Sequence, residues 1–234
     1  MKNNVLCDIQ RKWLKTVADV YVKNNSDVEY SRPYFFGIPE LFEHQPCIMI
    51  VGQEPDDFGS YGGDWELEAQ QQWGVQYLSI QLQKNGKLNP SPFWNAFRIM
   101  HDKGKGVLWN NLDKMHRIGT GKKTTQPLSV EDEKNLDCPY GNDKKSLLQR
   151  EVEIACPSAI WLAVGPYREE AIEISFNLEK GTLYQLRPRK EKWLSEIGSY
   201  LNLDMPVYWT YHPKYLSYLK VLPQCVQMIA ESKK

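Results

Sequence analysis

The sequence predicts a three-layer α/β/α fold, in which helices cover both faces of a mainly parallel four-stranded sheet. Four short, continuous apolar runs are typical of strands that are buried on both faces. Stretches with helical spacing separate these runs, and such alternation of strands and helices favours a parallel sheet. The expected strands are residues 47–52, 106–110, 159–165 and 206–212.

The first expected element is an amphipathic helix over residues 5–22. Apolar residues such as Val5, Ile9 and Trp13 recur there at near-helical spacing, and the pattern ends at the polar run 23–26. A turn-rich connection with Pro33 and Pro39 then leads to the first strand. The later helices are expected at residues 92–100, 145–155, 167–178, 190–201 and 216–232, the last of them interrupted by Pro223.

The length of 234 residues suits one large domain better than two. We therefore expect a single domain over residues 1–234, with residues 1–42 forming a helical N-terminal extension packed on it. Residues 117–145 are polar and predict a long loop, and loops of this length are usually functional or disordered.

The composition is that of a soluble globular protein, with 41% hydrophobic and 25% charged residues. The formal net charge is zero, which excludes a strongly basic coat but leaves a local basic patch open. Neither a signal peptide nor a membrane-spanning apolar run is recognisable, so we expect a cytoplasmic monomer without membrane contact.

The cysteines are odd in number, scattered, and never form a C-x-x-C pair. This pattern argues against a disulfide framework, a tetrahedral zinc site and a four-cysteine iron–sulfur cluster. We expect neither a metal ion nor an organic cofactor. The five cysteines are Cys7, Cys47, Cys138, Cys156 and Cys225.

Polar side chains follow three of the four expected strands. Gln53 and Glu54 come after the first, Asn110 ends the second, and His212 ends the fourth. In open α/β sheets, ligands bind beyond the carboxyl ends of the parallel strands. The sequence therefore predicts that a carboxylate, a carboxamide and an imidazole meet at one rim of the sheet.

Each of these residues also has a purely structural interpretation. Glu54 suits a helix cap or a turn, Asn110 and Asn111 suit a turn, and His212 suits a buried structural histidine. It is the order of the residues along the chain that favours a functional site.

That order resembles the motifs of the uracil-DNA glycosylase superfamily. Gly52-Gln53-Glu54-Pro55 is similar to the water-activating GQDP motif, with Glu in place of Asp. The run 107–110 is similar to the apolar strand whose final Asn reads uracil, and 160–165 to the strand before the last motif. His212-Pro213-Lys214-Tyr215-Leu216-Ser217 is similar to the HPSPLS motif, and Asn89-Pro90-Ser91-Pro92 to the proline-rich loop that compresses the DNA backbone.

The resemblance implies a DNA glycosylase that hydrolyses the bond between deoxyribose and uracil, or a related altered base, after flipping the base out of the DNA. Glu54 would orient the water, and His212 would stabilise the departing base anion. The implied base-binding residues are Gln53, Asn110, Tyr77 and Phe58, and the implied DNA-binding residues are Pro90, Ser91, Pro92, Lys214, Leu216 and Ser217.

Two positions depart from the family pattern: Glu54 is one methylene longer than Asp, and Asp56 replaces a Tyr that excludes the thymine methyl. The motif Pro55-x-x-Phe58-Gly59 is instead similar to the single-strand-selective branch. Two other functions therefore stay open. The first is a non-catalytic module that binds a nucleic acid end, a nucleotide or a protein, and the second is a hydrolase of free nucleosides or other small molecules.

Overall fold

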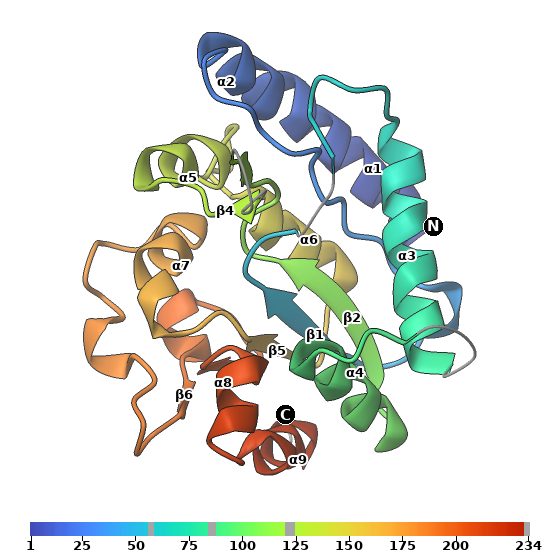
Figure 1. Ribbon diagram of the computed structural model, residues 1–234, viewed down its shortest axis with the longest axis vertical. Helices are drawn as coiled ribbons and strands as arrows, with labels where there is room; N and C mark the ends of the chain where they lie inside the picture. Colours follow the sequence, from blue (N-terminus) through green and yellow to red (C-terminus); the bar gives the residue numbers. More distant parts are fainter. Residues whose placement is uncertain (56–58, 84–87, 120–124, 232–234) are drawn as a thin grey trace.

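The central sheet has five strands in the order β2-β1-β5-β7-β6 within the part of the chain that the computed structural model describes, residues 1–55, 59–83, 88–119 and 125–231. Four strands are parallel, and the edge strand β6 runs antiparallel to β7 (Figure 1). Their bounds are β1 Cys47–Gly52, β2 Gly106–Asn111, β5 Ala159–Leu162, β6 Leu194–Glu196 and β7 Val207–Thr210.

Burial explains why the apolar runs form the parallel strands. All residues of β1 and β2 are buried, as a sheet covered on both faces requires. The register pairs Gly52 of β1 with Asn111 of β2, so these two strands end side by side. The polar residues that follow them consequently lie at the same edge of the sheet.

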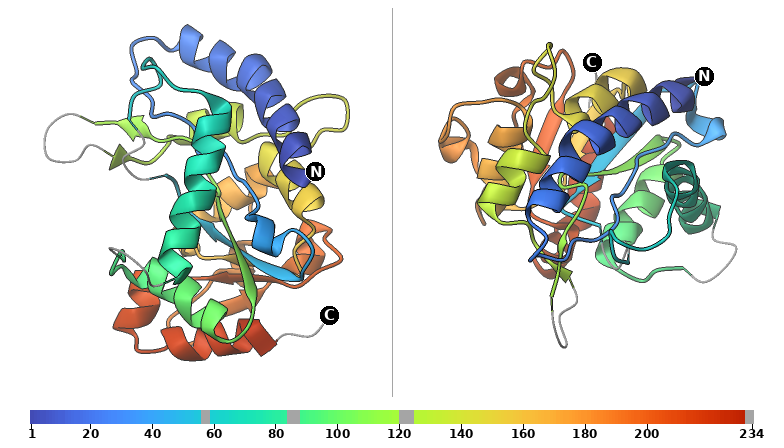
Figure 2. Two further views of the ribbon diagram at one scale, coloured as in Figure 1. Left: turned by 90° about the vertical axis from the view of Figure 1, so that its right-hand side faces the viewer. Right: turned by 90° about the horizontal axis from the view of Figure 1, so that it is seen from above.

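Helices flank the sheet in an arrangement consistent with three layers. Helix α4 contacts α3, α8 and α9, whereas α6 contacts α1 and α7 (Figures 1 and 2). None of the helices in the described ranges is long and apolar enough to cross a membrane. Their bounds are α1 Lys2–Trp13, α2 Asp19–Asn24, α3 Leu67–Gln83, α4 Pro92–Asp102, α5 Val130–Leu136, α6 Leu147–Ala155, α7 Glu169–Ser175, α8 Pro213–Tyr218 and α9 Leu222–Glu231.

The strand count and the helix expected at residues 190–201 are corrected by the structure. That segment contains strand β6 and a short 3-10 helix, Gly198–Leu201. Leu194 pairs with Thr210 and Glu196 with Tyr208, so backbone pairing with β7 overrides the helix-like spacing of the side chains. A Cβ atom at Gly198 would lie 2.5 Å from the Met205 carbonyl oxygen, so the chain needs glycine at this close approach.

Two other elements differ from the sequence-based expectation. Helix α3 was not predicted, because its glutamine-rich first half lacks a clear apolar stripe. The segment 117–145, expected as a loop, contains α5 and a two-stranded ribbon of β3 Arg117–Ile118 and β4 Thr125–Gln126. Ser129 caps α5 with a complete capping box, a local signal that was present in the sequence.

Residues 1–42 contribute to the core rather than only covering it. Tyr34 and Phe36 are buried in the cluster that contains the sheet residues, and Trp13 and Phe35 belong to a second buried cluster. The Tyr34 hydroxyl donates a hydrogen bond to the carbonyl oxygen of Trp109 in β2, 2.8 Å away. The N-terminal segment is thus tied directly to the sheet.

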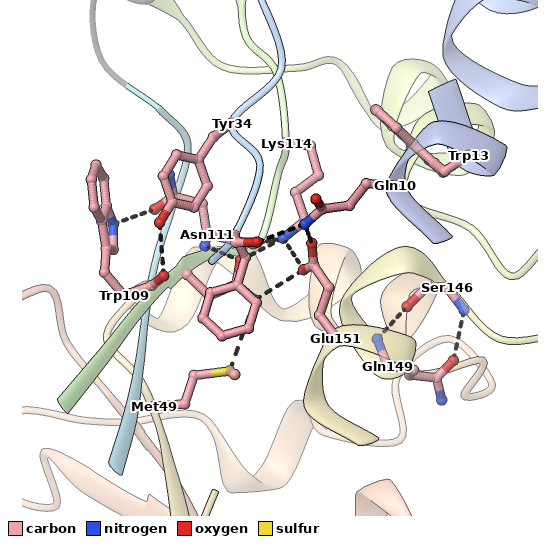
Figure 3. Close-up of polar contacts among 12 residues, drawn as sticks. Gln10, Trp13, Tyr34, Met49, Trp109, Asn111, Lys114, Ser146, Gln149 and Glu151 are labelled. Atoms are coloured by element: carbon pink, nitrogen blue, oxygen red, sulfur yellow. Dashed lines mark hydrogen bonds and ion pairs between the residues drawn. The ribbon is translucent and has the colours of Figure 1, made fainter. Parts of the chain in front are cut away.

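A buried polar network surrounds the end of β2. Lys114 and Glu151 form an ion pair in which both side chains are almost completely buried. Gln10 of α1 donates to the other oxygen of Glu151 at 2.9 Å, and Asn110 donates to Glu151 at 3.0 Å (Figure 3). The network therefore joins β2, α6 and the N-terminal helix.

Replacing Lys114 with Met should lower the free energy of unfolding by about 3–5 kcal/mol, because it leaves the buried carboxylate of Glu151 without its cation. Urea denaturation followed by circular dichroism measures this loss. The exposed pair Lys145–Glu153 is the matched control, and Lys145→Met should cost less than about 1 kcal/mol. Equal losses for the two variants would show that the buried pair does not hold β2 in place.

Candidate functional site

A cavity of about 750 Å³ opens at the carboxyl ends of β1, β2 and β7. Small-molecule sites in proteins usually have volumes of this order. Four residues expected from the sequence to form the site, Gln53, Glu54, Tyr77 and His212, all contribute to its lining. The complete lining is Gly52, Gln53, Glu54, Pro55, Trp73, Tyr77, Asn89, Ser91, Phe93, Trp94, Trp109, Asn111, Thr125 and His212.

Aromatic rings form much of the cavity wall. Trp73 and Tyr77, one turn apart on α3, stack with their ring centres 5.0 Å apart and their planes at 14°. Tyr77 also meets the edge of Trp94, and Trp94 meets Trp109, at centre distances of 5.0 and 4.8 Å. Such a wall offers flat apolar faces against which a planar ring can stack.

Asn111 lines this cavity and carries a buried amide N–H group that forms no hydrogen bond with a described residue. Its side chain is only 2% exposed, and its Oδ1 atom accepts a hydrogen bond from the indole N–H of Trp109 at 3.3 Å. Because an indole can only donate, the amide oxygen must face Trp109, and the Nδ2 group must face away from it. Nδ2 is buried and has no hydrogen-bond partner among the residues that the structure describes. Buried donors are almost always paired, so this one is suited to a ligand acceptor.

Gly52 allows Asn111 to take this position. A Cβ atom at residue 52 would lie 2.7 Å from the Asn111 oxygen, closer than real Cβ contacts. The glycine that precedes Gln53 therefore has a steric role that the sequence did not reveal.

Asn110, the residue expected to read the base, does not line the cavity. It is completely buried, and its amide is bonded to Glu151 and Lys114 in the network at the end of β2. Successive side chains of a strand point to opposite faces, so Asn111 lines the cavity and Asn110 does not. The network at the end of β2 also contacts the backbone of Asn111. Asn110 Oδ1 accepts a hydrogen bond from the backbone N–H of Asn111, and Lys114 donates one to the Asn111 carbonyl oxygen.

His212 is held in one orientation at the start of α8. Its Nδ1 atom accepts a hydrogen bond from the backbone N–H of Lys214 at 3.2 Å, so the neutral ring carries its proton on Nε2. Burial, and then the nearby charge of Lys214, lower the pKa of the His212 imidazole. The neutral ring thus presents an N–H donor on the side opposite Nδ1. Its plane is within 8° of that of Phe93, with the ring centres 6.0 Å apart.

Gln53 and Glu54 lie between this cavity and a second one of about 390 Å³, which they also line. The Gln53 amide donates to the carbonyl oxygen of Val164 at 2.7 Å and to the hydroxyl of Tyr167 at 2.6 Å. The side chain of Gln53 is therefore fixed by the segment that follows β5.

A buried arginine, Arg168, offsets part of the negative charge around Glu54. Arg168 forms ion pairs with Asp113 and Glu133. Burial disfavours the charged guanidinium, but the carboxylates of Asp113, Glu133 and Glu54 outweigh it and raise the pKa of Arg168. Arg168 accordingly remains a permanent cation behind the carboxylate of Glu54.

The expected DNA-inserting role of Leu216 is corrected by the structure. Leu216 is fully buried in the main core, whereas its neighbours Lys214 and Tyr215 are exposed and Ser217 is half-buried. The cause is that α8 starts at Pro213, which turns position 216 toward the core.

The proline-rich loop, residues 89–92, lies beside the cavity, and its residues Asn89 and Ser91 contribute to the lining. Ser91 caps α4 by accepting from the backbone N–H of Trp94, and Pro92 occupies the first turn of the helix. Pro90 is exposed, and Asn89 donates to the Tyr77 hydroxyl at 3.3 Å. Phe58, the other expected base-binding residue, and Asp56 lie outside the described residues.

Several residues of the site were not found from the sequence. Trp73 and Trp109 resemble core aromatics in any sequence pattern, and Asp113 and Arg168 are charged residues whose partners lie far along the chain. The one local signal was the pair of charges in Asp113-Lys114 directly after an apolar strand.

Among the described side chains, no group of three or more His, Cys, Asp or Glu residues is arranged to hold a metal ion. Models of known protein families give no match to this chain, and no curated protein matches it either. The geometry of the site therefore carries the functional proposal.

The imidazole of His212 should titrate below 6.5, its ordinary pKa. Because the folded-state pKa is lowered, the associated stability is present above the unfolded-state pKa and is lost as the pH falls through the folded value. Proton NMR of the ring, with His212→Gln to assign the signal, measures the titration. In Lys214→Gln the value should move back up, and a pKa above 6.5 in the unsubstituted protein would contradict this geometry.

Proposed function

We propose that this protein is a DNA glycosylase with a uracil-DNA glycosylase-like three-layer fold, and that it releases uracil or a related altered pyrimidine from DNA by hydrolysis. The reaction belongs to the base-excision class of DNA repair. Support comes from the mainly parallel sheet and from the cavity that brings Glu54, Asn111 and His212 to its carboxyl edge.

The observation that carries the proposal is the unpaired Nδ2 donor of Asn111. Uracil presents an acceptor at O4 beside a donor at N3. The Asn111 amide offers the matching pair, since its oxygen, already bonded to Trp109, has a second lone pair. Binding uracil would satisfy the buried donor. The nearby rings of Trp73 and Tyr77 supply surfaces for stacking an extruded base.

Glu54 and His212 supply the charges that bond cleavage needs. As the N-glycosidic bond breaks, positive charge develops on the sugar and negative charge on the base. A carboxylate at Glu54 stabilises the sugar cation and orients the attacking water. The Nε2–H donor of His212 stabilises the anion at the base O2, and one such preorganised donor is worth on the order of 10²–10³ in rate.

A second candidate function is hydrolysis of free nucleosides, and a third is binding without catalysis. The zero net charge favours both over a protein that coats DNA.

The purified protein should convert a uracil-containing oligonucleotide into an alkali-labile product. Glu54→Gln and His212→Ala should each reduce this release by roughly 10²-fold or more, with circular dichroism as the control for folding. Deoxyuridine serves as the competing substrate. Release from the nucleoside alone would favour the second candidate, and binding of the oligonucleotide without release would favour the non-catalytic module.

Glu170→Gln is the matched control for Glu54→Gln, because Glu170 lines only the second cavity. This substitution should leave the rate of base release unchanged. Near-normal release in Glu54→Gln and His212→Ala would remove both residues from the mechanism.

A further inference from the structure

The antiparallel strand β6 brings a basic turn to the rim of the site. Because Leu194 pairs with Thr210, the residues that precede β6 lie beside those that follow β7, where His212 is. The turn is closed by two backbone hydrogen bonds between Arg189 and Lys192, of 2.9 and 3.0 Å.

The turn carries positive charge that the rest of the protein does not neutralise. Arg189, Lys190 and Lys192 are exposed, and none of them forms an ion pair with a described residue. Glu191 is the one acidic residue of the turn, so the four residues carry a net charge of about +2. Lys214 of α8, also exposed, adds a further charge on the same side of His212.

Next to this turn, three tyrosines form a continuous aromatic surface. Tyr211 and Tyr215 have their ring centres 4.5 Å apart, and Tyr215 and Tyr218 are 6.0 Å apart. Tyr215 is 37% exposed and Tyr218 is 79% exposed. Thr210, which pairs with Leu194, is followed directly by Tyr211, so the tyrosine row begins at the end of β7 beside which the turn lies.

Such a combination fits single-stranded nucleic acid better than a duplex. Unpaired bases have free faces that stack on aromatic side chains, and their phosphates bind nearby basic groups. A duplex keeps its bases stacked on each other, and opening it requires an apolar wedge. The residue expected to be that wedge, Leu216, is fully buried in the core.

We infer that the tyrosine row Tyr211, Tyr215 and Tyr218, with the basic turn 189–192, is a binding surface for single-stranded DNA that leads the strand to the pocket. The row stacks the bases next to the one in the cavity, and the turn binds their phosphates. The inference that the strand leads to the pocket rests on the proposed function. Binding of single-stranded DNA to the surface does not depend on the release of a base.

Fluorescence anisotropy with a labelled 15-nucleotide oligothymidylate, and with a 15-base-pair duplex as the competing probe, tests the surface directly. The protein should bind the single strand more tightly. Tyr218→Ala should weaken this binding about 5- to 100-fold, the range for losing one base–aromatic stack, whereas Tyr218→Phe should retain it. A plot of the logarithm of the binding constant against the logarithm of the salt concentration has a negative slope. Changing Arg189, Lys190 and Lys192 together to Gln should make this slope less steep by about 2.

The controls lie at the amino ends of the parallel strands, the end opposite the cavity. Tyr200 is 47% exposed in the 3-10 helix after β6, and Lys103 and Lys105 precede β2. Tyr200→Ala and the double variant Lys103→Gln/Lys105→Gln should leave binding unchanged. Preference for the duplex, or equal effects of the control and test variants, would overturn the inference. Intact single-strand binding without base release would instead overturn the proposed function alone.

Discussion

The ion pair between Lys114 and Glu151 determines which side chain of β2 faces the cavity. Lys114 and Glu151 both bond to Asn110, which fixes that residue on the buried side of the strand. Strand alternation then places Asn111 on the other side, beside Gly52 and Trp109. A buried ion pair adds little net stability compared with an apolar core, but breaking it is costly. In this protein it specifies the orientation of the strand at the site.

The same constraint explains how far the sequence could predict the site. The four parallel strands were predictable because continuous apolar runs report burial on both faces. The choice between Asn110 and Asn111 was not predictable, because it depends on Glu151, 41 residues away in the chain. Likewise, the burial of Leu216 depends on where α8 starts relative to the core, and β6 depends on its pairing with β7. Local sequence patterns show the periodicity of apolar residues. Contacts between distant segments decide which side of a strand or helix faces the core and which faces the cavity.

The charge distribution is compatible with the proposed nucleic-acid ligand, although the formal net charge of the protein is zero. Acidic groups near the site lie around the buried cation Arg168, which offsets part of their negative charge. The turn before β6, next to the tyrosine row, carries exposed positive charge that forms no ion pair with a described residue. A local patch of this kind attracts phosphates without giving the whole protein a basic character.

The claim on which the account depends is that the Asn111 amide reads the base. Asn111→Asp keeps the shape of the side chain but removes the donor that faces O4 of uracil, and its carboxylate accepts from N4 of cytosine. A site rejects a ligand strongly, typically by ~10⁴-fold, when that ligand leaves the polar groups of the site unpaired. The most direct measurement is the ratio of kcat/KM for release of uracil and of cytosine from otherwise identical single strands. The account predicts that this ratio falls steeply in Asn111→Asp, even if both rates decrease. An unchanged ratio in an active Asn111→Asp enzyme would contradict it.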